Sequence, residues 1–426
     1  MDRLIKRLKR KRKIFIIVGG CTRRGLDASK LANYFRLNNC KIVRSPKNAD
    51  FIIIVTCSYK QSIIDNQIKT IKNLMNHNGE IIVLGCLPGI APVKLSKVFN
   101  GKTLSTKNIN NIDNFFPKFE VKYRDVDDTN KVYPSFNYLF ESIYKKRIQR
   151  KFLYPIFNPW NIFRYFKQIT KIRGIKKKRA VLRIAYGCNG HCSYCAIPLA
   201  TGRQISKPIK DIINEYKKLL KEGYLLFGLN SEDTGSYGVD IGKNFKELIT
   251  AMSKIDKGFK VKWQIQTLSP NYAIKYRQTL INLIKQDKIN YIKCDLQSGN
   301  QRILKLMNRY SDIHSMVDIY NDFNGAKKGI FTFSQFIVGF PSETDKEFQD
   351  TINIMKRLDL SMYQLFPYSD MENIVSYKMG NKVSDQEIKN RLKYAIESLK
   401  DRYESHTSKH FVMFIKLIDK DKPQKI

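Results

Sequence analysis

The stretch that decides the fold of the second half of the chain is Val181-Leu-Arg-Ile-Ala185, which continues as Tyr186-Gly-Cys188-Asn-Gly-His-Cys192-Ser-Tyr-Cys195. Its apolar run predicts a buried strand, and three cysteines with the spacing C-x3-C-x2-C follow directly. Three thiolates on one short loop can hold three corners of a [4Fe–4S] cube and leave the fourth iron open to a small chelating molecule. A structural zinc ion is the alternative, but zinc sites usually close with four ligands and only His191 is nearby as the fourth.

The residues after this loop alternate between predicted helices and strands. We predict a helix over residues 207–222 and strands over residues 225–229, 259–265, 291–296, 331–338 and 361–366. With the strand before the cysteines this gives about six βα units, which is too few for a closed eight-stranded barrel. The second half of the chain is therefore predicted to be a partial (β/α)6 barrel.

The first part of the chain also alternates between strands and helices. Apolar runs at residues 14–18, 51–55 and 81–84 predict strands of a parallel sheet in an α/β domain, and they lead into Cys21, Cys57 and Cys86 respectively. In open parallel sheets, ligands bind at the carboxyl ends of the strands. The three thiols could therefore converge there on a second cluster, although three buried cysteines acting as small apolar side chains are the alternative. Cys40 and Cys294 fit neither set and are interpreted as structural.

Composition bears on the partner and the compartment. Among 426 residues, Lys and Arg number 77 against 38 Asp and Glu, a net charge of +39 that favours polyanions such as RNA or a ribosomal particle. The same bias could reflect an AT-rich genome. We find neither a secretory signal nor an apolar run long enough to span a membrane, and so expect a cytoplasmic protein without membrane association. Its cysteines are then candidates for metal chemistry before disulfides.

Five segments follow from these patterns. They are a basic tail at residues 1–13, an α/β domain at 14–118, a linker at 119–179 that interleaves basic and aromatic residues, the partial barrel at 180–402 and a C-terminal tail at 403–426. The linker could grip phosphates and stack bases. Its aromatic residues could equally cover a neighbouring domain, the interpretation we slightly favour.

Several motifs resemble the radical S-adenosylmethionine (SAM) methylthiotransferases. The cysteine loop with Tyr194 before its third cysteine resembles the radical SAM signature. Further motifs in the family's order are Gly202-Arg-Gln-Ile-Ser-Lys-Pro208, Glu232-Asp-Thr-Gly-Ser-Tyr-Gly-Val-Asp-Ile-Gly242, Leu296-Gln-Ser-Gly299, Leu304-Lys-Leu-Met-Asn-Arg309 and Gly339-Phe-Pro-Ser-Glu-Thr344. Gly20-Cys21, Thr56-Cys57 and Gly85-Cys86 resemble the motifs of the family's amino-terminal domain. The resemblance covers about residues 14 to 400 except the linker.

The resemblance implies two [4Fe–4S] clusters and SAM as cofactors. One cluster would be held by Cys188, Cys192 and Cys195, and the auxiliary one, used in sulfur delivery, by Cys21, Cys57 and Cys86. SAM would be bound by Tyr194, Gln297 and Ser298, and Glu232 and Asp233 would lie close by. In this family the aromatic residue at the position of Tyr194 packs near the adenine of SAM.

The resemblance also implies insertion of a methylthio group at an unactivated C–H bond. The favoured substrate is C2 of N6-modified adenosine 37 in tRNA, of the threonylcarbamoyladenosine type that Glu232-Asp-Thr-Gly-Ser-Tyr-Gly238 most resembles. The alternatives are an aspartate of a ribosomal protein, another peptide, or a catalytically lapsed RNA-binding relative. We expect a monomer that takes electrons from a donor such as flavodoxin or ferredoxin.

The sequence departs from the family pattern in several places. Arg24 stands where the family usually has Asn, which would place positive charge near the second cluster. Lys207 replaces an Arg, and the Arg-x-Gly-Thr after Tyr-Ser is absent at Tyr368-Ser369. About two dozen residues follow residue 402, too few for the small RNA-binding β-barrel called TRAM. The basic tail and the linker are candidates to compensate.

Overall fold

A computed structural model describes residues 11–132, 179–407 and 411–416, which fall into two compact units. The first unit takes most of the chain up to residue 180 together with residues 221–226, and the second takes residues 59–65 and the remainder. Most of the predicted basic tail and linker lies outside the described residues. No helix in the described part of the chain is both long and apolar enough to cross a membrane.

The first unit is built on a five-stranded parallel sheet in the order β2-β1-β3-β4-β5. The predicted strands are present as β1 (Lys13–Gly19), β3 (Phe51–Thr56) and β4 (Glu80–Gly85), whose Ile- and Val-rich interiors are buried on both faces. Two short strands that the sequence analysis did not predict, β2 (Lys41–Val43) and β5 (Lys102–Ser105), form its edges.

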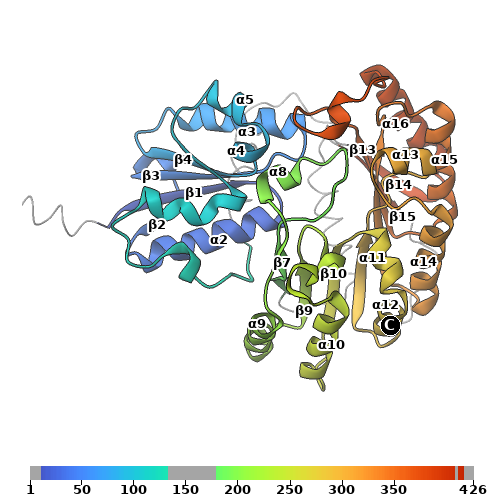
Figure 1. Ribbon diagram of the computed structural model, residues 1–426, viewed down its shortest axis with the longest axis horizontal. Coiled ribbons are helices and arrows are strands. Elements are labelled where there is room, and N and C mark those ends of the chain that lie inside the picture. The colour runs from blue at the N-terminus through green and yellow to red at the C-terminus, as the bar shows by residue number, and fades with distance from the viewer. Residues whose placement is uncertain (1–10, 133–178, 408–410, 417–426) are drawn as a thin grey trace, which may run out of the picture. The chain divides into compact units, whose positions relative to one another are not determined.

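Helices cover both faces of this sheet (Figure 1). On one face lies α2 (Thr22–Leu37), and on the other lie α3 (Gln61–Leu74), α4 (Leu87–Ile90) and α5 (Pro92–Ser96). The α2 side is closed by aromatic packing of Tyr34 and Phe35 against Phe116 and Phe119. Short 3-10 turns lie at Pro46–Asn48, Thr106–Phe115 and Tyr123–Asp125.

The second unit contains an eight-stranded sheet in the order β14-β15-β13-β12-β11-β10-β9-β6. The six predicted strands are present within a few residues of the expected bounds. They are β6 (Arg179–Arg183), β9 (Leu226–Asn230), β10 (Lys262–Leu268), β11 (Ile289–Cys294), β12 (Phe331–Val338) and β13 (Met362–Pro367). The neighbours from β10 to β13 pair in parallel. The α/β fold class with a partial barrel is thus confirmed.

The segment expected to be a C-terminal tail contributes two strands. β14 (Tyr403–Thr407) and β15 (Val412–Lys416) pair with each other in antiparallel register, and β15 pairs with β13. Val412 and Phe414 are buried and alternate with more exposed neighbours, so a period of two places this short segment on the sheet edge.

Helices connect the strands of the second unit (Figure 1). They are α8 (Ile197–Thr201), α9 (Ile209–Lys221), α10 (Phe245–Ile255), α11 (Pro270–Lys275), α12 (Arg277–Lys285), α13 (Gln301–Leu306), α14 (Ile313–Ala326), α15 (Asp345–Arg357) and α16 (Asp385–Leu399). Two short strands, β7 (Ala185–Tyr186) and β8 (Ile205–Ser206), pair in antiparallel register around the cysteine loop. Further 3-10 turns lie at Thr234–Ser236, Val239–Ile241 and Val375–Lys378.

Candidate active site

The loop that carries Cys188, Cys192 and Cys195 begins directly after β7. Gly187 opens it with φ +66°, and a Cβ at this position would lie 2.1 Å from the carbonyl oxygen of Arg203, so only glycine fits. The N–H of Cys188 then donates to the Gly202 carbonyl at 3.1 Å. The turn is therefore closed at its base by backbone contacts with residues 202 and 203.

The thiols of this loop lie close together. A Cβ on Gly190 would stand 3.2 Å from the Cys188 sulfur and 3.9 Å from the Cys192 sulfur, so both face the same small space. Burial raises the pKa of Cys195 to about 12, and the neighbouring Cys192 thiol acts in the same direction. Burial likewise raises the pKa of Cys188 to about 11, against the Gly190 N–H, which donates to its sulfur at 3.2 Å. Without a metal, burial thus favours the protonated thiols. Bound iron would favour the thiolates instead, because a metal deprotonates the thiols that bind it.

Backbone carbonyls and apolar side chains of residues 303–307 hold the loop in place. Ser193 donates through its N–H to the Met307 carbonyl and through its hydroxyl to the Leu306 carbonyl, at 3.1 and 2.7 Å. The ring of Tyr194 packs against a buried cluster formed by Ile303, Met307 and Phe340. The described contacts of Tyr194 are thus with the protein core, and its predicted contact with SAM stays a prediction.

Arg309 is a site residue that the sequence analysis quoted in a motif without giving it a role. Its guanidinium is buried, with Nη1 3.8 Å from the Cys192 sulfur and Nη2 donating to the Asp295 carbonyl. Burial favours the neutral form of Arg309, yet its pKa is raised because the neighbouring Tyr194 and Cys192 favour the charged guanidinium. A buried positive charge beside Cys192 would offset the negative charge of a cluster held there.

His191 does not complete a zinc site. It is exposed, and its Nε2 lies 3.1 Å from Nη1 of Arg203. Among the described residues, no group of three His, Cys, Asp or Glu side chains is arranged around a single metal ion. In a [4Fe–4S] cube each cysteine binds a different iron, so its sulfurs do not need to meet at one point. The donor set of three neighbouring thiols therefore fits a cluster better than a lone ion.

Glu232 and Asp233 lie beside the cysteine loop, where β9 ends. Negative charge on either raises the pKa of Cys188, which places both carboxylates near that thiol. Asp233 accepts hydrogen bonds from the Ser269 hydroxyl at 2.6 Å, the Ser269 N–H at 3.2 Å and the Gly235 N–H at 3.1 Å. Burial raises the pKa of Asp233, and these hydrogen bonds oppose that effect.

Gln297 and Ser298 follow β11 and differ in what they offer a ligand. Gln297 is buried with φ +75°, a strained conformation for a non-glycine residue, and its side-chain oxygen has no donor within the described part of the chain. The Ser298 hydroxyl instead accepts from the Asn300 N–H at 3.1 Å and lies 3.4 Å from the Thr351 hydroxyl. Gln297 therefore keeps a free acceptor for a bound molecule, whereas Ser298 is occupied by the protein.

The first unit brings Cys21, Cys57 and Cys86 together at the carboxyl ends of β1, β3 and β4. The Cys57 thiol lies within hydrogen-bonding reach of both Cys21 and Cys86, and these contacts raise the pKa of Cys57 well above its usual value. Its partner Cys21 has a lowered pKa, mainly because of the hydrogen bond from Cys57 and then the charges of Arg23 and Arg24. A set of neighbouring thiols beside positive charge suits an iron–sulfur cluster as well as the first set does.

Close backbone packing brings these strand ends together. A Cβ on Gly20 would lie 2.6 Å from the Cβ of Cys57, and one on Gly85, where φ is +102°, would lie 2.4 Å from the Thr56 carbonyl oxygen. Glycine before the first and third cysteines is thus a packing requirement. Arg24, the departure from the family pattern, is buried, forms an ion pair with Asp27 at 3.1 Å and donates to Thr106.

Cys40 and Cys294 lie outside both sets. Both are buried, and burial is the main reason that their pKa values are raised. Their surroundings agree with the structural role expected for them.

Two protein families match separate parts of the chain, one for each set of cysteines. Residues 182–355 match the Radical SAM superfamily, and residues 13–105 match a family described as Uncharacterized protein family UPF0004. The solved structure of TsrM from Kitasatospora setae, a radical SAM methyltransferase, aligns with a TM-score of 0.55 at 11% identity over 84% of this chain and 75% of that one. At this identity the likeness concerns the fold alone.

Three curated relatives are each 27% identical to the chain. A probable threonylcarbamoyladenosine tRNA methylthiotransferase from Pyrococcus horikoshii is matched over 86% of this chain and 79% of its own length. A tRNA-2-methylthio-N(6)-dimethylallyladenosine synthase from Petrotoga mobilis and a ribosomal protein uS12 methylthiotransferase from Carboxydothermus hydrogenoformans are each matched over 90% of this chain and 82% of theirs.

Enzymes of this kind use SAM and [4Fe–4S] clusters, so the predicted cofactors and the predicted transferase class are confirmed. Relatives that act on tRNA and on a ribosomal protein are equally similar, which leaves the substrate to other arguments. The match to the Radical SAM superfamily, the match to UPF0004 and these relatives agree with one another: the chain is similar to the radical SAM methylthiotransferases.

Proposed function

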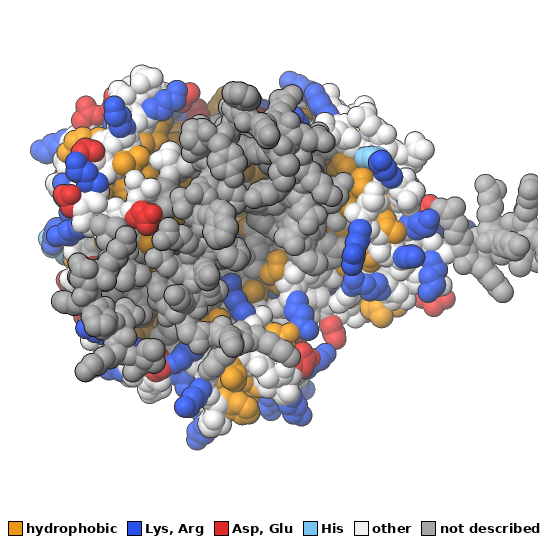
Figure 2. Space-filling model, turned by 180° about the vertical axis from the view of Figure 1, so that it is seen from behind, with side chains coloured by type: hydrophobic (Ala, Val, Ile, Leu, Met, Phe, Trp, Pro, Cys, Tyr) orange, Lys and Arg blue, Asp and Glu red, His pale blue; other side chains and the backbone are white. Residues whose placement is uncertain are grey.

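We propose that this enzyme adds a methylthio group to C2 of N6-threonylcarbamoyladenosine 37 in tRNA. The observation that carries the proposal is the basic character of the chain, +39 overall, joined to a Glu232–Gly238 motif that resembles the subgroup acting on this nucleoside. Figure 2 shows one face on which Lys and Arg side chains are far more abundant than Asp and Glu. Such a surface raises the local concentration of RNA and speeds its encounter.

The two sets of cysteines would hold the two clusters. Cys188, Cys192 and Cys195 would hold the one that binds SAM, and Cys21, Cys57 and Cys86 the auxiliary one. With SAM, these groups supply radical hydrogen abstraction and a sulfur source, chemistry that belongs to the cofactors. In support, each set gathers neighbouring thiols at loops that follow strands.

The other side chains of the site would position SAM and balance charge. Arg309 would offset the negative charge of the cluster from beside Cys192. Gln297 would offer its unpartnered oxygen to a donor group of SAM, and Tyr194, Glu232, Asp233 and Ser298 would line the same region. Asp233 is held in one orientation by Ser269, which limits the positions open to its carboxylate.

The experiment is nucleoside mass spectrometry of tRNA from a deletion strain. Loss of the methylthio form of threonylcarbamoyladenosine, restored by the wild-type gene but not by C57A or C192A, supports the proposal. The C40A and C294A variants are matched controls, because each removes a cysteine outside both sets. Unchanged tRNA together with a lighter ribosomal protein uS12 would instead assign the enzyme to the ribosomal-protein branch. We also propose a cytoplasmic monomer reduced by flavodoxin or ferredoxin.

A further inference from the structure

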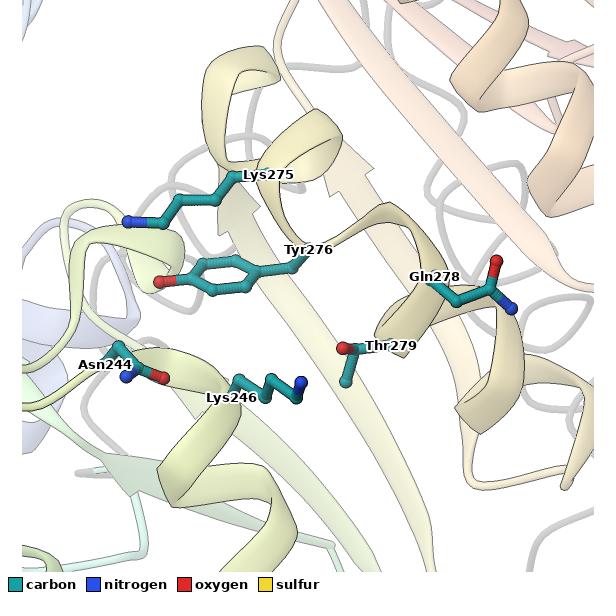
Figure 3. Close-up of a pocket in the computed structure, with 6 residues that line it drawn as sticks. All are labelled: Asn244, Lys246, Lys275, Tyr276, Gln278 and Thr279. Carbon is teal, nitrogen blue, oxygen red and sulfur yellow. The ribbon is translucent and has the colours of Figure 1, made fainter.

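A pocket of about 380 Å³ lies in the second unit, lined by Asn244, Lys246, Lys275, Tyr276, Gln278 and Thr279 (Figure 3). The first two of these residues belong to the beginning of α10, and the others lie at the junction of α11 and α12. In Figure 3 the Tyr276 ring lies across the pocket with its hydroxyl toward Asn244, while Lys246 and Thr279 point toward each other. The pocket is a separate place from the two cysteine sets.

The pocket is nevertheless close to the active site. The ring of Tyr276 stacks on that of Tyr272 with centroids 6.2 Å apart, and Tyr272 packs against Gly235, two residues after Asp233. The charge of Asp233 acts on the pKa of both tyrosines, and that of Cys188 acts on Tyr272. One tyrosine ring therefore separates the pocket from the loop that lies beside the cysteines.

The lining is rich in cations and hydrogen-bond donors. Lys246 and Lys275 have no ion-pair partner among the described residues, and Lys275 lies over the Tyr276 ring, 5.6 Å from its centroid. The nearby carboxylates are engaged elsewhere, since Glu247 accepts from Asn244 at 2.7 Å and pairs with Lys243 at 3.3 Å, while Asp322 pairs with Arg277. The helices α10 and α12 also begin at the pocket, and the positive end of a helix dipole favours an anion.

The hydroxyl of Tyr276 points independently to a ligand. The side chain is buried, with Tyr276 only 5% exposed, yet its hydroxyl makes no hydrogen bond of normal geometry within the described part of the chain. The Phe245 N–H acts on it as a donor, and the carboxylates of Asp233 and Glu247 act on it through their charge without accepting a hydrogen bond, so the hydroxyl proton lacks an acceptor within the described part of the chain. A buried donor without an acceptor is unfavourable, and an anion in the pocket would supply the acceptor.

We propose that this pocket binds a phosphate of the RNA backbone next to the nucleotide that enters the active site. The proposal rests on the proposed function, because it takes RNA to be the substrate. Two lysine ammonium groups, the hydroxyls of Tyr276 and Thr279 and two helix beginnings match the charge and the acceptor oxygens of a phosphodiester. An RNA that places one base beside the cysteine loop necessarily carries phosphates past the rim of that site.

The test compares two double variants that each remove two positive charges. K246Q/K275Q changes the pocket, and K254Q/K257Q changes exposed lysines near the other end of α10. Affinity of the full-length holoenzyme for tRNA is measured by filter binding at several salt concentrations. We expect the pocket variant to lose about tenfold in affinity and about one unit of salt slope, with a smaller change in the control. Y276F should lose several-fold in affinity and keep the slope.

Each other outcome overturns the proposal in a recognisable way. Equal effects of the two double variants would mean that the pocket adds only net charge. Weakened binding of uS12 with unchanged tRNA binding would assign the pocket to a protein substrate. A thermal shift with inorganic phosphate alone that K246Q/K275Q abolishes, with tRNA affinity unchanged, would assign it to free anions. If the wild-type enzyme restores no methylthio nucleoside, the proposed function is wrong. If it restores the modification but the pocket variant binds tRNA as well as wild type does, only the pocket proposal is wrong.

Discussion

Replacing Gly187 by alanine should damage the cysteine loop far more than an alanine at another left-handed glycine. Gly187 has φ +66°, and its added methyl group would meet backbone atoms, Arg203 oxygen at 2.1 Å and Gly202 oxygen at 2.8 Å. Gly223 has φ +81° with nothing within 4 Å of an added Cβ. Gly223→Ala therefore serves as the control for the conformational cost alone.

The surroundings of the two glycines determine how much unfolding free energy each variant should lose. A left-handed alanine costs about 1–2 kcal/mol, which both variants share. At Gly187 the backbone must also move by roughly 1 Å to reach normal contact, which breaks the hydrogen bond from the Cys188 N–H to the Gly202 carbonyl and disturbs the pairing of β7 with β8. We expect about 2 kcal/mol or more beyond the control.

Two assays decide the matter. Chemical denaturation gives the loss of unfolding free energy in each variant, and iron analysis after anaerobic reconstitution gives the cluster content. Gly187→Ala should keep about half of the wild-type iron, because only the loop at Cys188 is displaced, and Gly223→Ala should keep all of it. Equal stability loss in the two variants, or full iron in Gly187→Ala, would refute the reasoning.

Three further predictions concern other parts of the chain. Arg309→Gln removes the buried charge beside Cys192, so reconstituted enzyme should release iron to a chelator faster than wild type, while Arg309→Lys should be intermediate; equal release rates would contradict this. Arg302 lowers the pKa of Glu347 to about 2. The ion pair between the two residues therefore contributes fully to stability above about pH 4.5, and this contribution is lost as the pH falls through 2. Arg302→Gln should therefore cost about 1–2 kcal/mol at pH 7 after allowance for solvent screening, and only a small fraction of that near pH 2, as measured by urea denaturation at both pH values. Phe35→Ala empties a fully buried position in the first unit and should cost about 3–5 kcal/mol by the same method, whereas Leu37→Ala, at an exposed position of the same helix, should cost less than 1 kcal/mol.

Much of the fold could be predicted because its strands are apolar and buried. Short runs rich in β-branched residues, such as Phe51–Thr56, are typical of strands that are buried on both faces of a parallel sheet. The edge strand Lys41–Val43 is short and partly exposed, so its pattern does not stand out from a loop. The strands after residue 402 were missed for a related reason, since Val412–Lys416 shows only a brief alternation and is stabilised by pairing with β13.

The candidate site also has parts that the sequence predicts and parts that it does not. Cysteine spacing and position after strands are local features, and they indicated both sets of thiols. Contacts across the fold carry no such signal: Arg309 reaches the sulfur of Cys192 from 117 positions away, and the pocket at Tyr276 combines residues of three helices without a motif. The exact role of Ser298 also depends on Thr351, which the sequence does not place beside it.

The most direct test of two separate clusters is Mössbauer spectroscopy with iron and sulfide analysis on two triple alanine variants. One variant replaces Cys21, Cys57 and Cys86, and the other replaces Cys188, Cys192 and Cys195. We predict that each retains one [4Fe–4S] cluster and about half of the iron, and that only the first still cleaves SAM. Full iron in the first variant would show that the thiols gathered at the end of the amino-terminal sheet hold no cluster.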